Sequence, residues 1–245
     1  MKEDKIYASQ EIGDAPFRFN SAVAEVFPDM LRRSIPGYAA SLEAIGSLAA
    51  RYVTPGTSCY DLGCSLGAAT LAMRQGIRAA NCRIFSVDNS AAMIERCKGI
   101  IAADHSSAAS KTPVEVTLGD IRDTAITNAS MVVLNYTLQF LGLNDRDELI
   151  KRIVDGLVPG GLLVLSEKVI DKDPHMQALL VDLHHEHKRR NDYSQLEISR
   201  KRAALEDVLI PETVAGHRDR LAAAGFAHSG VWLRYFNFVS IVAIK

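Results

Sequence analysis

The sequence lacks the patterns that define several large classes of protein. None of its four cysteines is paired at Cys-x-x-Cys spacing, so neither a zinc knuckle nor a redox motif is indicated. No run approaches the roughly 20 apolar residues that span a bilayer. No apolar targeting core follows the polar first residues. We therefore expect a reduced, cytoplasmic protein that binds no metal and no membrane.

An excess of one charge is also missing. The 28 Lys and Arg residues nearly balance the 29 Asp and Glu residues, which leaves a net charge of −1. A chain without a basic excess has no long-range attraction for the phosphates of a nucleic acid. We therefore expect no direct binding of nucleic acid.

The pattern that is present is an alternation of short β-rich runs with helical stretches. At 245 residues, 48% of them hydrophobic, the chain has the size of one α/β domain with an irregular segment at 1–20. The alternation predicts a mostly parallel seven-stranded sheet with helices on both faces and a C-terminal antiparallel hairpin. The expected strands are 59–62, 83–88, 114–118, 129–134, 162–167, 231–233 and 236–244.

Helices are expected between these strands, at 37–51, 68–75, 91–103, 145–157 and 212–224. Pro28 should divide the helical spacing of 23–31 into short pieces, because proline removes a backbone hydrogen bond. The run Pro159-Gly160-Gly161 should stop the helix before the fifth strand. A polar loop is expected at 104–113, and a charged helical insertion occupies about 171–210.

One stretch organises the predicted sheet: Tyr60-Asp61-Leu62-Gly63-Cys64-Ser65-Leu66-Gly67. It reads as a strand end, a glycine turn and the start of a helix, which present backbone N–H groups to an anionic or carboxylate-bearing ligand. Its spacing differs from the dinucleotide fingerprint, which needs three glycines. The stretch resembles the signature loop of class I S-adenosylmethionine (SAM)-dependent methyltransferases and so predicts their Rossmann-like fold. An ordinary turn between a strand and a helix is the alternative.

Polar side chains stand at the ends of the next three predicted strands. Asp88 ends the second strand, Asp120 follows the third and Asn135 follows the fourth. Ligands of open α/β sheets bind beyond these ends. Asp88 could accept hydrogen bonds from ribose, Asp120 and the N–H of Ile121 could meet adenine, and Asn135 would lie near the sulfonium. Each acid could also be only a helix cap or a turn former.

The insertion carries two polar clusters. His184, His185 and His187 lie on a predicted helix, where His184 and His187 share a face and are a conceivable metal pair. No acid completes a metal motif, so a solvated or packed face is the simpler interpretation. Lys188-Arg189-Arg190 is most simply a solvated charge run, with RNA contact as the alternative.

Arg202 stands on an apolar stripe of the insertion. Ile198, Arg202, Leu205 and Leu209 share one face if the helix continues through all four. An inward arginine needs an anionic partner, and a guanidinium suits a carboxylate best. The alternative is that the stem of Arg202 packs while its charged head reaches water.

Together these segments resemble one family, the carboxy-S-adenosyl-L-methionine synthases. The resemblance runs from about residue 16 to the C-terminus and includes the insertion, while 104–112 is unmatched. Tyr136 stands where the family pattern leads us to expect Phe. The paired-proline motif of amino-group methyltransferases is absent after the fourth strand. The matching segments are 27–30, 33–38, 60–70, 88–90, 119–123, 133–140, 193–199 and 201–202.

The resemblance implies that SAM and prephenate give carboxy-SAM, phenylpyruvate and water, and that carboxy-SAM then serves the 5-oxyacetyl modification of the tRNA wobble uridine. Such a reaction depends on positioning, electrostatic stabilisation and exclusion of water more than on a strong base. The family also implies a homodimer. Arg202 would hold the new carboxylate and Tyr38 would lie over the ligand, so these two are the expected catalytic residues. The implied ligand contacts are Tyr38, Gly63, Cys64, Ser65, Asp88, Asn89, Asp120, Ile121, Asn135 and Arg202.

Two other functions remain open from the sequence. A conventional SAM-dependent methyltransferase of a small molecule or RNA would release S-adenosylhomocysteine. A non-catalytic SAM-binding or RNA-associated protein would bind SAM without turnover.

Overall fold

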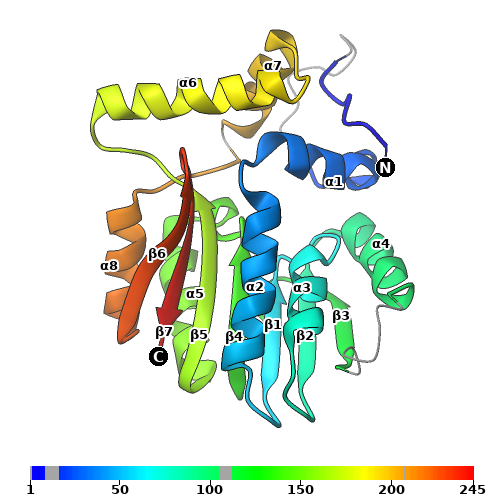
Figure 1. Ribbon diagram of the computed structural model, residues 1–245, viewed down its shortest axis with the longest axis vertical. Helices are drawn as coiled ribbons and strands as arrows, with labels where there is room; N and C mark the ends of the chain where they lie inside the picture. The colour runs from blue at the N-terminus through cyan, green and yellow to red at the C-terminus, as the bar shows by residue number, and fades with distance from the viewer. Residues whose placement is uncertain (1, 9–16, 105–111, 207) are drawn as a thin grey trace.

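A single seven-stranded sheet forms the centre of the molecule in a computed structural model that describes residues 2–8, 17–104, 112–206 and 208–245 (Figure 1). The strand order is β3-β2-β1-β4-β5-β7-β6. Strands β1 to β5 pair in parallel, and β7 is antiparallel to both β5 and β6. The predicted mostly parallel sheet with a C-terminal hairpin is confirmed. The strands are β1 Ser58–Leu62, β2 Arg83–Asp88, β3 Val114–Leu118, β4 Ala129–Asn135, β5 Leu157–Lys168, β6 His228–Tyr235 and β7 Phe238–Ile244.

Helices cover both faces of the sheet, as predicted (Figure 1). Alternate residues of β4 show the two cores: Met131 and Val133 pack on the side of α2 and α3, and Val132 and Leu134 pack on the side of α5. The helices are α1 Ser21–Ser34, α2 Tyr38–Tyr52, α3 Ala68–Gly76, α4 Ala91–Ala102, α5 Leu143–Gly156, α6 Pro174–Arg190, α7 Gln195–Leu205 and α8 Val214–Ala224, with a 3₁₀ turn η1 Leu138–Phe140.

The helix α1 runs unbroken through Pro28, so the predicted division of this segment is wrong. Proline removes one backbone hydrogen bond, at a cost of about 3 kcal/mol. The helix nevertheless buries Val23, Phe27 and Met30 in one apolar cluster. Asn20 also caps its first turn by accepting a hydrogen bond from the N–H of Val23 at 3.0 Å. Tertiary burial therefore outweighs the local cost of Pro28.

The strand β5 begins at Leu157, directly after α5, and not at residue 162 as predicted. Residues 159–161 (Pro-Gly-Gly) lie inside β5, where its pairing with β4 is irregular. Gly160 takes a φ of 76°, which a regular strand does not accommodate. The Pro-Gly-Gly run therefore interrupts strand pairing, and α5 has already ended at Gly156.

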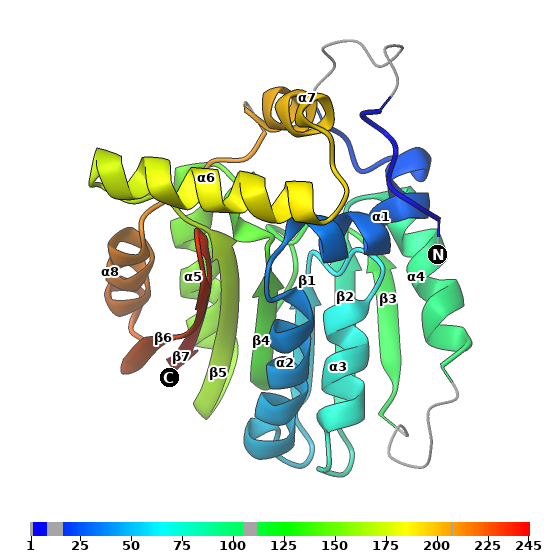
Figure 2. The ribbon, with the colours of Figure 1, turned by 45° about the horizontal axis from the view of Figure 1, so that its top comes forward.

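The insertion and α1 lie across the carboxyl ends of the parallel strands (Figures 1 and 2). Residues 2–8 are irregular, as predicted, but Asp4 is only 1% exposed and accepts a hydrogen bond from the hydroxyl of Tyr193. We call α1, α6 and α7 the cap. Most of the predicted loop at 104–113 lies outside the described residues. Every helix among the described residues is too short or too polar to span a bilayer.

Candidate functional site

A cavity of about 680 Å³ lies between the carboxyl ends of the strands and the cap. We call it the ligand cavity, because its volume is within the usual range for small-molecule sites. It opens at the switch point of the sheet, where the chain runs outward from β1 to β3 and then returns to β4 on the other side of β1. Its lining includes nearly all the site residues predicted from the sequence: Tyr38, Gly63, Cys64, Ser65, Asp88, Asn89, Asp120, Ile121 and Asn135.

The loop between β1 and α3 turns through left-handed backbone at Gly63 (φ 79°), Ser65 (φ 48°) and Gly67 (φ 82°). A Cβ added to Gly63 would lie 2.3 Å from Cγ2 of Thr137, so only glycine fits there. Ser65 holds an unfavourable φ for a non-glycine residue, and its N–H donates to Oδ2 of Asp88 at 2.9 Å. The loop is therefore tied to the end of β2.

The predicted row of bare loop N–H groups is only partly present. The N–H groups of Gly63 and Cys64 both donate to the carbonyl of Val87, at 2.8 and 3.0 Å. The helix terminus behind them stays open, since α3 has no side-chain cap and its first residues Ala68 and Ala69 line the cavity. An anionic group would meet the N-terminus of α3 rather than the loop itself.

Asp61 and Asp88 are buried acids at the ends of β1 and β2. Burial raises the pKa of Asp61 to about 6, although the hydroxyl of Thr70 donates to it at 2.5 Å. The two oxygens of Asp88 accept the N–H groups of Ser65 and Ser90, each at 2.9 Å, and burial raises its pKa as well. Backbone hydrogen bonds thus fix the orientation of the Asp88 carboxylate at the cavity wall.

Asp120 has a different environment. Arg122 clamps its carboxylate through Nε and Nη2, at 2.7 to 3.1 Å, and this hydrogen bonding holds the pKa of Asp120 below its usual value. Arg122 also bonds to Asp145, and all three side chains line the cavity. The adenine contact predicted for Asp120 must therefore share its carboxylate with Arg122.

Asn135, at the end of β4, carries a buried Oδ1 atom that has no hydrogen-bond partner among the described residues. An unsatisfied buried acceptor costs about 1–3 kcal/mol, which a ligand with a suitable donor or positive charge would offset. The next residue, Tyr136, has a φ of 62°, and its ring centroid lies 6.3 Å from that of Tyr38 on α2. Burial raises the pKa of both tyrosines, so both hydroxyls are neutral.

Arg202 does not face inward, which corrects the prediction made from the apolar stripe. Its side chain is exposed and is not among the residues that line the cavity. The helix α7 ends at Leu205, so Leu209 is not part of the same helical face. Packing turns Ile198 and Lys201 toward the interior instead. Burial, and after it the charge of Arg202, lower the pKa of Lys168, a residue that lines the cavity.

The sequence interpretation missed several cavity residues of the cap. Lys188 belongs to the run interpreted as solvated, yet it is buried while Arg189 and Arg190 are exposed. His184 is buried too, with Nε2 2.9 Å from the carbonyl of Ser34, and burial lowers its pKa to about 2. Among the residues that the structure describes, no group of His, Cys, Asp and Glu side chains is arranged to hold a metal. The helical spacing of His184 and Lys188 alone could not indicate which side of α6 is covered.

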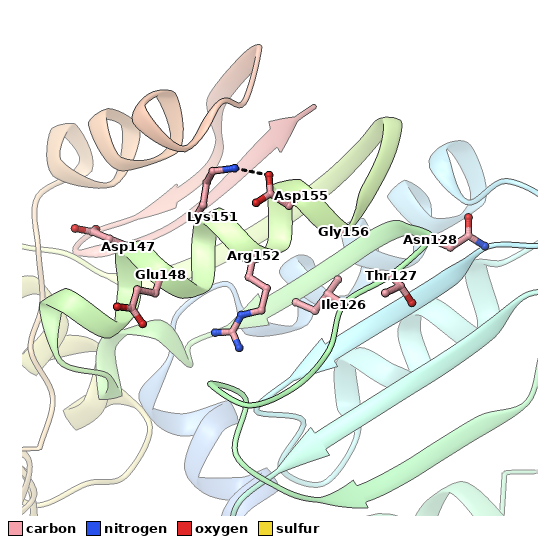
Figure 3. Close-up of a pocket in the computed structure, with 9 residues that line it drawn as sticks. All are labelled: Ile126, Thr127, Asn128, Asp147, Glu148, Lys151, Arg152, Asp155 and Gly156. Carbon is pink, nitrogen blue, oxygen red and sulfur yellow. Dashed lines mark hydrogen bonds and ion pairs between the residues drawn. The ribbon is translucent and has the colours of Figure 1, made fainter.

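A second hollow, of about 740 Å³, lies beside α5 and the residues that precede β4 (Figure 3). It is shallow and is lined by residues 126–128 and by one face of α5 between Asp147 and Gly156. Most of its charged groups are already engaged: Lys151 pairs with Asp155, Asp147 pairs with Arg220, and Arg152 donates to the carbonyl of Arg122. We assign no ligand to this hollow.

The topology and the site define a class I methyltransferase-like α/β protein. A family model described as "Methyltransferase domain" matches residues 60–161. An O-methyltransferase family protein from Burkholderia thailandensis superposes with a TM-score of 0.65 at 15% identity, covering 95% of this chain and 65% of that one. Human N-acetylserotonin methyltransferase in complex with SAM gives a TM-score of 0.61 at 17% identity, over 92% and 55% of the two chains. Likeness at such low identity supports the fold only.

Similarity in sequence is much higher for one group of proteins. The carboxy-S-adenosyl-L-methionine synthase of Shewanella woodyi is 54% identical over 99% of this chain and 98% of its own length. That of Vibrio cholerae is 54% identical over 96% and 93%, and that of Trichlorobacter lovleyi is 52% identical over 100% and 99%. The chain belongs to the carboxy-S-adenosyl-L-methionine synthase family and is an enzyme, a transferase.

Proposed function

We propose that the ligand cavity binds SAM and that the enzyme converts SAM and prephenate to carboxy-SAM, phenylpyruvate and water. The observation that carries the proposal is that the insertion lines the same cavity as the loop after β1. A loop of this kind is shared by many methyltransferases and so indicates SAM binding without distinguishing among reactions. The cap adds a second wall, which a reaction between SAM and another small molecule requires.

The residues of the sheet side fit SAM. Asp88 keeps lone pairs free for the ribose hydroxyls, because its two backbone hydrogen bonds leave part of its acceptor capacity unused. The open N-terminus of α3 suits the amino-acid carboxylate. The unpartnered Oδ1 of Asn135 suits the positively charged centre. When SAM is bound, its sulfonium makes the methyl group acidic, and prephenate supplies the carbon dioxide that becomes the new carboxyl group.

Among the described residues that line the cavity, none offers a strong base near the Asn135 end. His184 is held neutral, with a pKa near 2. Tyr38 and Tyr136 keep their protons, because burial raises their pKa. The contribution of this chain is then to orient the two substrates and to exclude water beneath the cap.

Arg202 remains the proposed ligand of the new carboxylate, on the strength of the family resemblance. Its exposed position means that the side chain must turn inward when the ligand binds. The product would then be consumed by a separate carboxymethyl-transfer reaction at the tRNA wobble uridine. We also propose that the enzyme is a cytoplasmic homodimer.

The proposal is tested by incubating the purified protein with SAM and prephenate and recording the products by mass spectrometry. We expect phenylpyruvate together with a SAM species heavier by one carbon dioxide unit. Formation of S-adenosylhomocysteine would identify a conventional methyltransferase instead. Unchanged SAM after prolonged incubation would refute the proposed activity.

A further inference from the structure

Three lysine side chains from three different elements line the ligand cavity. Lys168 ends β5, Lys188 lies in α6 and Lys201 lies in α7. We call them the lysine cluster. Lys188 and Lys201 are only 7% and 6% exposed, and Lys168 is half-buried. Two of the three lysines therefore come from the cap and one comes from the sheet.

The charge of the lysine cluster is largely unneutralised. The ammonium of Lys201 donates to the hydroxyl of Ser34 at 3.0 Å and lies 3.7 Å from a carboxylate oxygen of Asp4. In the described part of the chain, the ammonium groups of Lys168 and Lys188 have neither a hydrogen bond nor an ion pair. Lys188 therefore points a buried, unpartnered donor at the cavity.

The charges that surround Lys188 add to this imbalance. Burial, and after it the positive charges of Lys201 and Lys168, together lower its pKa to about 7. Burial and the charge of Arg202 likewise lower the pKa of Lys168. His184, one turn before Lys188 on α6, is neutral. Asp4, the acid that pairs with Lys201, also accepts the hydrogen bond of the Tyr193 hydroxyl.

A buried ammonium without a partner is costly, so such groups are retained where a ligand brings the opposite charge. The charged side chains of the cavity are separated by sign. Asp61 and Asp88 occupy the sheet side, next to the loop after β1, and the lysine cluster occupies the cap side with the end of β5. One cavity therefore offers acceptors to a cation at one end and donors to an anion at the other.

We infer that the lysine cluster is the binding subsite for the carboxylate groups of the second substrate, with Lys188 in direct contact. The inference rests on the proposed function, in which that substrate is prephenate, a dicarboxylate. Lysine is suited to this role, because its compact charge can serve a carboxylate from several directions. The run Lys188-Arg189-Arg190 would then contain one substrate-binding residue and two solvated ones.

The test measures binding without turnover. S-adenosylhomocysteine has no methyl group to carboxylate, so protein saturated with it can be titrated with prephenate in a calorimeter. We expect Lys188→Gln to weaken prephenate binding by at least tenfold and to leave the affinity for S-adenosylhomocysteine unchanged. The matched control is Lys172→Gln, an exposed lysine at the start of the insertion, which should bind both ligands as the wild type does. Thermal unfolding should show Lys188→Gln to be at least as stable as the wild type, because it loses a buried charge.

Two results of this titration would overturn the inference. The first is that prephenate binds to Lys188→Gln as tightly as to the wild type. The second is that the affinity of the variant for S-adenosylhomocysteine falls by the same factor as its affinity for prephenate, because the lysines would then bind the carboxylate of SAM. If wild-type protein does not bind prephenate, the proposed function fails and malonate serves as the probe of the subsite. Malonate binding that Lys188→Gln weakens would then support a dicarboxylate subsite, and absent or unchanged binding would reject it.

Discussion

At the residue scale, Lys201 and Arg202 show how one position along a helix changes a side chain's surroundings. Successive residues of a helix point about 100° apart, so neighbours cannot share a face. Lys201 reaches Ser34 inside the molecule, whereas Arg202 is exposed. The apolar stripe proposed from sequence assumed a helix that continues to Leu209, and α7 ends at Leu205.

The role of Arg202 can be separated from that of the lysine cluster. If its guanidinium turns inward to clamp the new carboxylate, Arg202→Ala should lower the affinity for carboxy-SAM by at least tenfold, because hydrogen bonds to charged groups contribute about 1.5–3 kcal/mol. The affinity for SAM should change less than twofold. Calorimetric titration with both ligands measures the two values.

Arg189→Ala, which removes an exposed arginine from α6, is the control and should alter neither affinity. Equal losses for SAM and carboxy-SAM in Arg202→Ala would show that Arg202 does not recognise the carboxyl group.

At the scale of elements, the loop between β1 and α3 depends on a residue from another connection. Gly63 faces Thr137, which lies between β4 and η1, and there is no space for a Cβ between them. The left-handed backbone at Gly63 is therefore only part of the requirement. The loop packs against the connection that follows β4, so this contact fixes two parts of the ligand cavity relative to each other.

Gly63→Ala should therefore cost more than the backbone penalty alone, which is roughly 1–2 kcal/mol for a left-handed residue. We expect a loss of stability of about 3 kcal/mol and SAM binding weakened by more than tenfold. Urea denaturation and calorimetry measure these effects. The double variant Gly63→Ala with Thr137→Ala should recover only the steric part.

Gly56→Ala is a matched control for this substitution. Gly56 also has a positive φ, of 74°, but a Cβ there would meet nothing within 4 Å. It should show the backbone penalty and normal SAM binding. A loss of stability in Gly63→Ala no larger than that in Gly56→Ala would contradict the proposed clash with Thr137.

At the scale of the whole molecule, the cap is held by contacts between segments that are distant in sequence. Asp4, near the N-terminus, accepts a hydrogen bond from Tyr193 and lies close to Lys201, both in the insertion. Arg33 of α1 donates from Nε to the carbonyl of Asn191 at 2.6 Å. Several of these polar contacts are buried, so the cap behaves as part of the core rather than as a mobile tail.

The buried lysines also predict how the stability of the molecule depends on pH. The ordinary lysine pKa of 10.5 falls to about 7 for Lys188 and to about 8 for Lys201, mainly because of burial. At a pH between the lowered pKa of each lysine and its ordinary value, the unfolded chain binds more protons than the folded protein. The free energy of unfolding therefore rises with pH. Lys188 alone should contribute about 2 kcal/mol between pH 7 and 9.

Urea denaturation at pH 7 and pH 9, without ligand, measures this rise. Lys188→Met should be more stable than the wild type at pH 7 and should lose most of the rise. The comparison ends at pH 9 because thiols such as Cys59, whose pKa burial raises to about 12, lower the free energy of unfolding at higher pH. A wild-type protein with no rise would show that the Lys188 ammonium is fully solvated.

The alternation of strands and helices in the sequence by itself determined the order of elements from β1 to β5 and the α/β fold class. Short-range patterns suffice for this, because burial on a sheet or a helix repeats with a fixed period. The same patterns predicted that Gly63, Asp88 and Asn135 lie together at one site, since residues at successive strand ends meet at one edge of a parallel sheet. Local propensity was less reliable where burial competes with it, as at Pro28 and in the Pro-Gly-Gly run of β5.

Only the tertiary structure decided which residues of the insertion face the ligand cavity. The orientation of α6 and α7 about their axes depends on what they cover, and the sequence of a charged helix carries little apolar pattern to indicate it. Lys168, Lys188 and Lys201 are brought to one cavity by packing across the strand ends, and Arg202 is turned away by the same packing. The physical reason is that burial of a charged side chain depends on partners that are distant in the chain.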